Sequence, residues 1–260
     1  MSEIHPTAII GEGAEIDETA RVGPYAFVGP NVSLGKGVVL RAHACVTGYT
    51  SVGEETEIFP FAVVGEVPQD LKYRGEATRV VIGARNTIRE HVTINIGTTG
   101  GGGLTRIGDG NLLMSGAHVG HDSKIGNHTI LGNNVLLAGH VIVEDYAVIY
   151  AQAAVQTFLR VGESSFLAAK AGLMQDLAPF TWAQGHPTRL LKINRVGLER
   201  RGVPAARIQA IERAFRTIFR SGQRPRDAFA AAREASPDCP EVERLIAFLE
   251  KSEHGFARVR

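Results

Sequence analysis

The residues best suited to chemistry lie in two short segments, at His118, His121, Asp122, Gly139 and His140. His121 and Gly139 are eighteen residues apart, and so are Asp122 and His140. Transfer of an acyl group to a hydroxyl needs a base that works near neutral pH and a donor for the oxyanion that forms on the carbonyl. An imidazole and a backbone N–H supply both functions.

In this interpretation His121 is the general base and the N–H of Gly139 binds the oxyanion. Asp122 would hold the imidazole in one tautomer and stabilise its charged form. The scheme requires no serine or cysteine nucleophile.

Two other interpretations stay open for these histidines. Any one of them alone is more often an ordinary polar residue on a protein surface. Three imidazoles on neighbouring segments can also bind zinc, as in the carbonic anhydrases built on similar repeats. His118 and His121 have no obvious third ligand in the same column, so we expect no metal.

A repeat of six residues determines which of these side chains become neighbours. Aliphatic residues recur at every sixth position over long stretches of the chain. The starts are Ile4, Ile10, Ile16, Val22, Val28, Leu34, Leu40, Val46, Val52, Ile58 and Val64, then Ile82, Ile88 and Ile94, and then, shifted by one, every sixth residue from Ile107 to Leu173. Neither a helical period of 3.6 nor strand alternation produces this step.

The repeat predicts a solenoid of short strands that turns after each hexad. Three strands per coil give an eighteen-residue triangular prism with the aliphatic residues inside and glycines at the tight corners. Residues n and n+18 are then one strand spacing apart, roughly 4.8 Å. The pattern is that of hexapeptide-repeat proteins, and this resemblance implies a left-handed β-helix.

Two segments break the step of six, at 70–81 and 98–103. We expect both to be excursions from the coil. Loops that a rigid scaffold holds out are frequent places for function, although either one alone could be a tolerated surface insertion.

The spacing becomes helical from about Leu190, and Pro204 and Pro225 lie where helices could begin. The predicted domains are a β-helix over 1–185 and a helical domain over 186–260 that caps the solenoid. Residues 186–226 hold eleven Lys or Arg against two Glu, a local charge of +9 in a chain of net charge +1. Such a patch suits a phosphate or an acidic protein, or is a solvated helix face; no nucleic-acid module accompanies it.

The composition is that of a soluble globular protein, with 44% hydrophobic and 21% charged residues. We find no leader, no membrane span and no ligand spacing at Cys45 and Cys239, so we expect a cytoplasmic protein with two thiols of no special role.

Six segments resemble the UDP-N-acetylglucosamine O-acyltransferases, the family that begins lipid A biosynthesis. They are GEVPQDLKY (65–73), GGGL (101–104), NLLM (111–114), AHVGHD (117–122), LAGHV (137–141) and GLERRG (197–202). The resemblance covers nearly the whole chain, including the helical part.

The resemblance implies a homotrimer with sites between subunits, acyl carrier protein as the donor and no cofactor. It implies that His121 is the base, Asp122 its partner and Gly139 the oxyanion donor. The residues that it places on the sugar nucleotide, the acyl group or the carrier phosphates are Asp70, Lys72, His118, His140, Gln156, Asn194, Arg200 and Arg201.

The chain departs from the family at Asn95, Gln156, Thr157 and Val196, which leaves open whether the acceptor is a 3-hydroxyl or a 3-amine. Ala169 occupies a position where glycine permits a longer acyl chain, so we expect a modestly shorter 3-hydroxyacyl group. The alternatives are another hexapeptide acyltransferase that acts on a different nucleotide sugar, and a non-catalytic scaffold.

Overall fold

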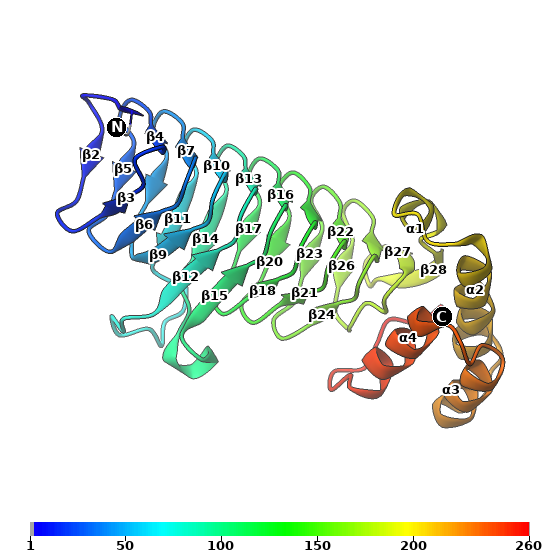
Figure 1. The fold of residues 1–260 in the computed structure, drawn as a ribbon. Helices are drawn as coiled ribbons and strands as arrows, with labels where there is room; N and C mark the ends of the chain where they lie inside the picture. Colours follow the sequence, from blue (N-terminus) through cyan, green and yellow to red (C-terminus); the bar gives the residue numbers. More distant parts are fainter. Residues whose placement is uncertain (1–2, 260) are drawn as a thin grey trace.

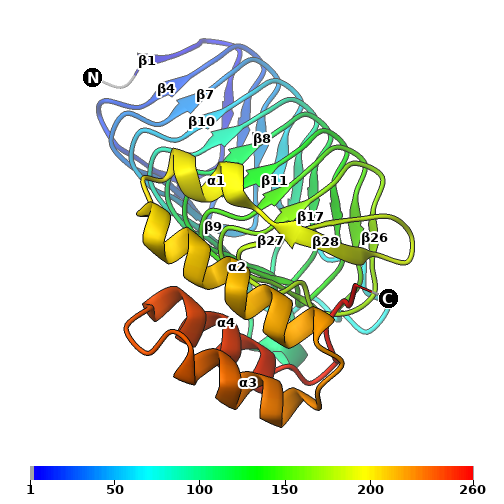
Figure 2. The same cartoon turned by 90° about the vertical axis from the view of Figure 1, so that its right-hand side faces the viewer.

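The computed structural model describes residues 3–259, and most of them form one long left-handed parallel β-helix. The hexad repeat predicted the solenoid, and the resemblance to hexapeptide-repeat proteins implied its left hand. Short strands stack in three sheets that run the length of a triangular prism (Figure 1). The helices follow at the C-terminal end, where they lie side by side beyond the last coils (Figure 2).

The three sheets are named A, B and C in the order in which the chain first enters them. Sheet A contains β1 (Glu3–Ile4), β4 (Arg21–Val22), β7 (Val39–Leu40), β10 (Glu57–Ile58), β13 (Thr87–Ile88), β16 (Leu112–Leu113), β19 (Ile130–Leu131), β22 (Val148–Ile149), β25 (Phe166–Leu167), β27 (Thr181–Gln184) and β28 (Arg189–Ile193). Sheet B contains β2 (Ile9–Ile10), β5 (Phe27–Val28), β8 (Cys45–Val46), β11 (Val63–Glu66), β14 (Thr93–Asn95), β17 (His118–Val119), β20 (Leu136–Leu137), β23 (Ala154–Val155) and β26 (Gly172–Leu173). Sheet C contains β3 (Glu15–Ile16), β6 (Val32–Leu34), β9 (Tyr49–Val52), β12 (Arg79–Ile82), β15 (Leu104–Ile107), β18 (Lys124–Ile125), β21 (Ile142–Val143) and β24 (Arg160–Val161).

The register confirms the eighteen-residue coil where no excursion intervenes. His118 pairs with Leu136 and Val119 with Leu137, each eighteen residues further on. The aliphatic residue of each hexad points into the prism, and Val119 and Leu137 are fully buried. Burial of this continuous aliphatic column is what stabilises the coils.

The glycines that follow the aliphatic residues have another role than the one expected. The corners with positive φ are occupied mainly by other residues, such as His43 and Tyr146. Gly53 instead lies so close to the next coil that a Cβ would be 2.6 Å from the carbonyl carbon of Gly83. These glycines are therefore needed for close stacking of backbone on backbone rather than for the turn itself.

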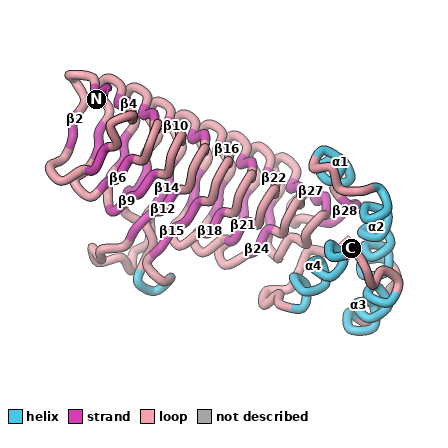
Figure 3. The backbone as a smooth tube through the Cα atoms, viewed as in Figure 1, coloured by secondary structure: helices cyan, strands magenta, loops and turns pink. Residues whose placement is uncertain are grey.

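Both predicted excursions exist, and they project from neighbouring coils of the prism (Figure 3). The first spans 67–78 and ends before the predicted 81, because Arg79 already pairs with Tyr49 in sheet C. Ile82 pairs with Val52, thirty residues earlier, so this excursion adds two whole hexads and leaves the phase unchanged. The second contains a 3-10 turn at Thr99–Gly101 and causes the shift in phase.

The chain ends in four helices: α1 (Arg195–Arg200), α2 (Ala205–Arg220), α3 (Pro225–Glu234) and α4 (Pro240–Glu250). Pro204 is the N-cap of α2 and Pro225 is in the first turn of α3, as the sequence predicted. None of these helices is long and apolar enough to cross a bilayer.

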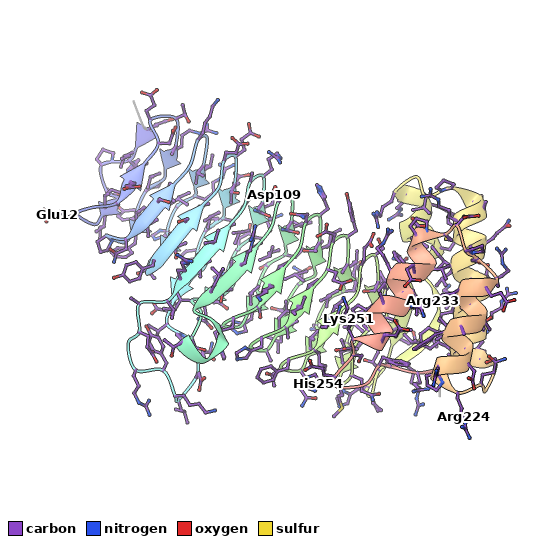
Figure 4. All side chains as sticks on the ribbon, turned by 60° about the horizontal axis from the view of Figure 1, so that its bottom comes forward. Glu12, Asp109, Arg224, Arg233, Lys251 and His254 are labelled. Atoms are coloured by element: carbon purple, nitrogen blue, oxygen red, sulfur yellow. The ribbon has the colours of Figure 1, made fainter. Side chains whose placement is uncertain are left out.

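The junction between the two parts is continuous. The antiparallel strand β28 extends sheet A beyond β27, and α2 contacts β28. The C-terminal segment then returns to the coils, as the position of His254 shows (Figure 4). The ring centroid of His254 is 6.4 Å from that of Phe158. The domain boundary at 185 stays a prediction, since it falls between two strands that pair with each other.

Candidate active site

One corner of the prism holds the residues expected to do chemistry. Asp122, His140 and Phe158 occupy equivalent positions in three successive coils, each with a left-handed backbone, at φ values of 61°, 64° and 66°. His121 and Gly139 precede the first two of these positions. The coil geometry therefore brings together residues that are eighteen apart in the sequence, as predicted.

His121 has the geometry of an oriented base. Its Nδ1 lies 2.8 Å from Oδ2 of Asp122, and the Asp122 side chain is 0% exposed. Since an ionised carboxylate only accepts hydrogen bonds, this contact requires a proton on Nδ1. The other ring nitrogen, Nε2, is then free to accept a proton.

Gly139 lies directly against that free nitrogen. A Cβ on Gly139 would be 2.6 Å from both Nε2 and Cε1 of His121, so only glycine permits this approach. The N–H of His140, the residue after Gly139, donates to the carbonyl of His121 at 2.9 Å. This bond fixes the two backbone segments relative to each other. Within residues 3–259 the N–H of Gly139 donates to no other group, which leaves it available to an oxyanion.

His140 is the second histidine of the cluster. Its ring meets that of His121 edge-on at 5.1 Å, and its Nε2 lies 3.8 Å from Oδ2 of Asp122. Burial lowers the pKa of His140, and the charge of His121 acts in the same direction, although the carboxylates of Asp122 and Asp70 oppose them. A neutral His140 can donate one hydrogen bond and accept another.

His118 lies in sheet B beside the cluster. Its Nδ1 is 2.8 Å from the hydroxyl oxygen of Thr93. Burial lowers the pKa of His118, and the nearby His121 adds to that effect. His118 also lines a cavity of about 380 Å³ on the outer face of sheet B, with Gln156 and apolar neighbours such as Leu136 and Met174.

The side chains of His121, Asp122 and His140 are close enough to hold a metal ion between them, with ligand atoms all within 4.8 Å of one another. This group is two histidines and one carboxylate, and not the three imidazoles that a carbonic anhydrase site would need. The Oδ2 atom of Asp122 already accepts hydrogen bonds from His121 and from the hydroxyl of Thr98. The arrangement therefore differs from the three-imidazole site, and Asp122 is bonded to His121 as the partner of a base would be.

The other predicted site residues lie in three places. Asp70 and Lys72 are in the first excursion, where Asp70 accepts the Lys72 N–H at 2.9 Å. Asn95 is in β14, which pairs with the strand of His118, and Gln156 follows β23 and lines the same cavity as His118. Thr157 follows Gln156, and Ala169 is exposed just after β25. Asn194, Val196 and Arg200 line a second cavity, of about 520 Å³, beside Tyr150, Phe166 and Trp182.

Arg201 does not join that second cavity. Its guanidinium lies 3.7 Å from the ring centroid of Tyr146 and donates to Glu163 and Ser164. Arg244 of α4 pairs with the same Glu163. These contacts join the helices to the coils, and the predicted contact of Arg201 with a phosphate group stays a prediction.

Sequence reasoning missed two residues of the site. Phe158 stacks on His140 with ring centroids 4.3 Å apart, and its place eighteen residues after His140 is a signal that could have identified it. Thr98 donates to both oxygens of Asp122. No spacing predicts Thr98, because it lies in an excursion that is outside the repeat.

Known proteins resemble this chain over its whole length. The profile of the family described as "Udp N-acetylglucosamine O-acyltransferase; Domain 2" matches residues 176–257, and that of the hexapeptide repeats of bacterial transferases matches residues 104–139. A curated relative from Myxococcus xanthus (strain DK1622), named acyl-(acyl-carrier-protein)–UDP-N-acetylglucosamine O-acyltransferase, is 45% identical over 99% of this chain and 100% of its own length.

Solved structures agree with this relation. The UDP-N-acetylglucosamine acyltransferase from Campylobacter jejuni has a TM-score of 0.94 at 35% identity, over 99% of this chain and 100% of its own. The enzyme of that name from Bacteroides fragilis 9343 has a TM-score of 0.95 at 38% identity, over 98% of this chain and 99% of its own. The chain belongs to the UDP-N-acetylglucosamine O-acyltransferase family.

Proposed function

We propose that this enzyme transfers a 3-hydroxyacyl group from acyl carrier protein to the 3-position of UDP-N-acetylglucosamine or its 3-amino analogue, the first step of lipid A biosynthesis. The observation that carries the proposal is the His121–Asp122 pair, whose free Nε2 faces Gly139, in a chain that matches this family from end to end. That full-length match does not favour the alternative of a transferase for a different nucleotide sugar.

In the proposed mechanism, Nε2 of His121 removes the proton from the acceptor as its oxygen or nitrogen attacks the thioester carbonyl. The N–H of Gly139 stabilises the oxyanion, and Asp122 stabilises the imidazolium. When the tetrahedral intermediate collapses, the C–S bond breaks and the proton passes from His121 to the leaving thiolate. No covalent enzyme intermediate is formed.

We place the acyl chain in the cavity on sheet B. Leu136, Ala154 and Gly172 form its floor, with His118 at one end and His186 among the lining residues. An apolar groove that begins at His118, on the same coil as the base His121, suits a hydrocarbon chain. We propose that Ala169, at the corner after β25, limits the length of this chain.

We place the nucleotide or the carrier phosphates at the second cavity. Arg200 and Lys192 supply positive charge there, while Trp182 and its aromatic neighbours supply flat apolar surface. Arginine suits phosphate through its fixed fork of donors. Asp70, Lys72, His140 and Gln156 are proposed to contact the sugar.

One experiment tests the donor, the acceptor and the chain length together. The protein is incubated with UDP-N-acetylglucosamine or its 3-amino analogue and with a series of 3-hydroxyacyl carrier proteins, and the products are identified by mass spectrometry. Transfer to either sugar supports the proposal, while an intact protein that acylates neither contradicts it. His121→Ala is the control, and we expect it to lose activity by about 10²- to 10⁴-fold.

The same products test Ala169. If Ala169 limits the chain as proposed, the unchanged protein should prefer a shorter chain than Ala169→Gly, which lacks the methyl group. Equal preferences would contradict this role. We also propose that the working form is a cytoplasmic homotrimer.

A further inference from the structure

The carboxylate of Asp122 is held by one residue of the second excursion. The N–H of Thr98 donates to Oδ1 of Asp122 at 2.8 Å, and the hydroxyl of Thr98 lies 2.7 Å from Oδ2. Oδ2 also accepts the Nδ1–H of His121. Thr98 alone thus donates to both oxygens of this fully buried carboxylate, and the bond from His121 comes in addition.

The direction of the Thr98 hydroxyl is itself set by the excursion. The N–H of Gly101 donates to Oγ1 of Thr98 at 3.2 Å, so the hydroxyl uses a lone pair in that contact. Its own proton is then directed to Oδ2 of Asp122, which can only accept. The result is a chain of hydrogen bonds from Gly101 through Thr98 to Asp122, where the bond from His121 also ends.

The excursion is closed tightly over the carboxylate. The N–H of Gly103 donates to the carbonyl of Thr98 at 2.7 Å, and Arg79 of β12 donates to the carbonyl of Gly103 at 3.0 Å. A Cβ on Gly101 would be 2.0 Å from Cγ of Asp122, which leaves no room for a side chain or for water at that point. A fully buried carboxylate depends on the donors that the protein supplies.

We propose that Thr98 is a positioning residue for this reaction, acting through Asp122 on the orientation of His121; the inference rests on the proposed function. Thr98 donates no proton to the substrate. Its hydroxyl keeps Asp122 in the rotamer that receives Nδ1–H, so that Nε2 of His121 faces Gly139 when the acceptor's proton arrives. The proton itself moves from the acceptor to Nε2 and then to the thiolate.

The test compares variants with and without the hydroxyl. Thr98→Val keeps the shape and the backbone N–H, and we expect kcat to fall roughly 10- to 100-fold, the worth of one hydrogen bond to a charged group, with the KM of both substrates unchanged. Thr98→Ser should restore kcat to within a few-fold. Thr98→Ala serves as a second variant without a hydroxyl if valine disturbs folding.

A double-mutant cycle separates positioning from a general structural role. In an Asp122→Ala background, Thr98→Val should cause no further loss, because its effect passes through the carboxylate. The matched control is Thr129→Val, which removes a fully buried hydroxyl that donates to Asn111 within the coils, and which should keep full kcat.

The inference is overturned if Thr98→Val retains kcat, if serine fails to restore it, or if the loss is the same in the Asp122→Ala background. An original protein that transfers no acyl group to either sugar would instead refute the proposed function. The two failures are therefore distinguishable.

Discussion

At the scale of single residues, the site depends on how closely Gly139 approaches His121. The φ angle of Gly139 lies outside the left-handed region, so only the lack of space excludes a side chain there. The imidazole cannot easily move away, because its Nδ1 is bonded to a buried carboxylate. The pair therefore behaves as one unit.

We predict that Gly139→Ala lowers kcat by about 10²- to 10³-fold, the usual effect of disturbing an oxyanion donor. The added methyl group would be 2.6 Å from Nε2 of His121 and would displace the ring. Steady-state kinetics with the carrier-bound donor measure the loss, and circular dichroism checks the fold. Full activity of this variant would remove Gly139 from the mechanism.

The partly buried His118 predicts how stability depends on pH. Burial lowers the pKa of His118 from its ordinary 6.5, so in acid the unfolded chain takes up a proton that the folded protein does not. Its contribution to stability is complete above pH 6.5 and decreases as the pH falls toward the lower pKa of the folded state. We expect the free energy of unfolding in urea to fall over this range, and less steeply for His118→Gln. An equal slope in both proteins would contradict the prediction.

At the scale of elements, the coils are held apart by a single strand spacing, and that spacing decides which residues fit between them. Gly53 follows β9, and its α-carbon faces the backbone at Gly83 in the next coil. A methyl group there would force the two coils apart.

We predict that Gly53→Ala lowers the free energy of unfolding by about 1–3 kcal/mol, the usual cost of overpacking. Gly100→Ala is the matched control, because its Cβ would meet no atom nearer than 4.0 Å. Urea unfolding of both variants at one protein concentration measures the difference. If the two changes cost the same, close stacking does not require the glycine.

The hexad repeat was sufficient to predict the coil, the pairing of His121 with Gly139 and the place of Asp122 beside His140. It could do so because every coil repeats the same geometry, so a distance in sequence becomes a distance in space. The excursions obey no such rule, and Thr98 reaches Asp122 only through the closure of a glycine-rich loop. The contacts of Arg201 with Glu163 and Tyr146 could not be predicted either, because they depend on how the helices pack against the coils.

At the scale of the whole molecule, the three outer faces of the prism differ in polarity. The outward residues of sheet C include charged side chains such as Glu15, Arg106 and Lys124. The outward column of sheet B contains no Asp, Glu, Lys or Arg: Ile9, Phe27, Cys45, Val63, Thr93, His118, Leu136, Ala154 and Gly172. The strands of this sheet hold one carboxylate, that of Glu66 at the end of β11, outside the column. Ile9 and Leu136 are 62% and 53% exposed in the single chain.

An apolar face of this length is what a protein covers in an assembly, because exposing it to water is unfavourable. The face also carries His118 and the proposed acyl groove. We therefore expect sheet B to pack against neighbouring subunits in the proposed trimer, which would enclose the acyl chain between two copies of the chain.

We predict that the double variant Phe27→Asp, Val63→Asp weakens the trimer, since two carboxylates would lose water when the face is covered. Light scattering should give a mass near three times 27.9 kDa for the original protein and a lower mass for the variant. The matched control, Ser33→Asp with Ser51→Asp, places the same charges on sheet C and should leave the mass unchanged. If only the control dissociates, the subunits meet through sheet C, and the acyl groove on sheet B must be closed by the carrier protein instead.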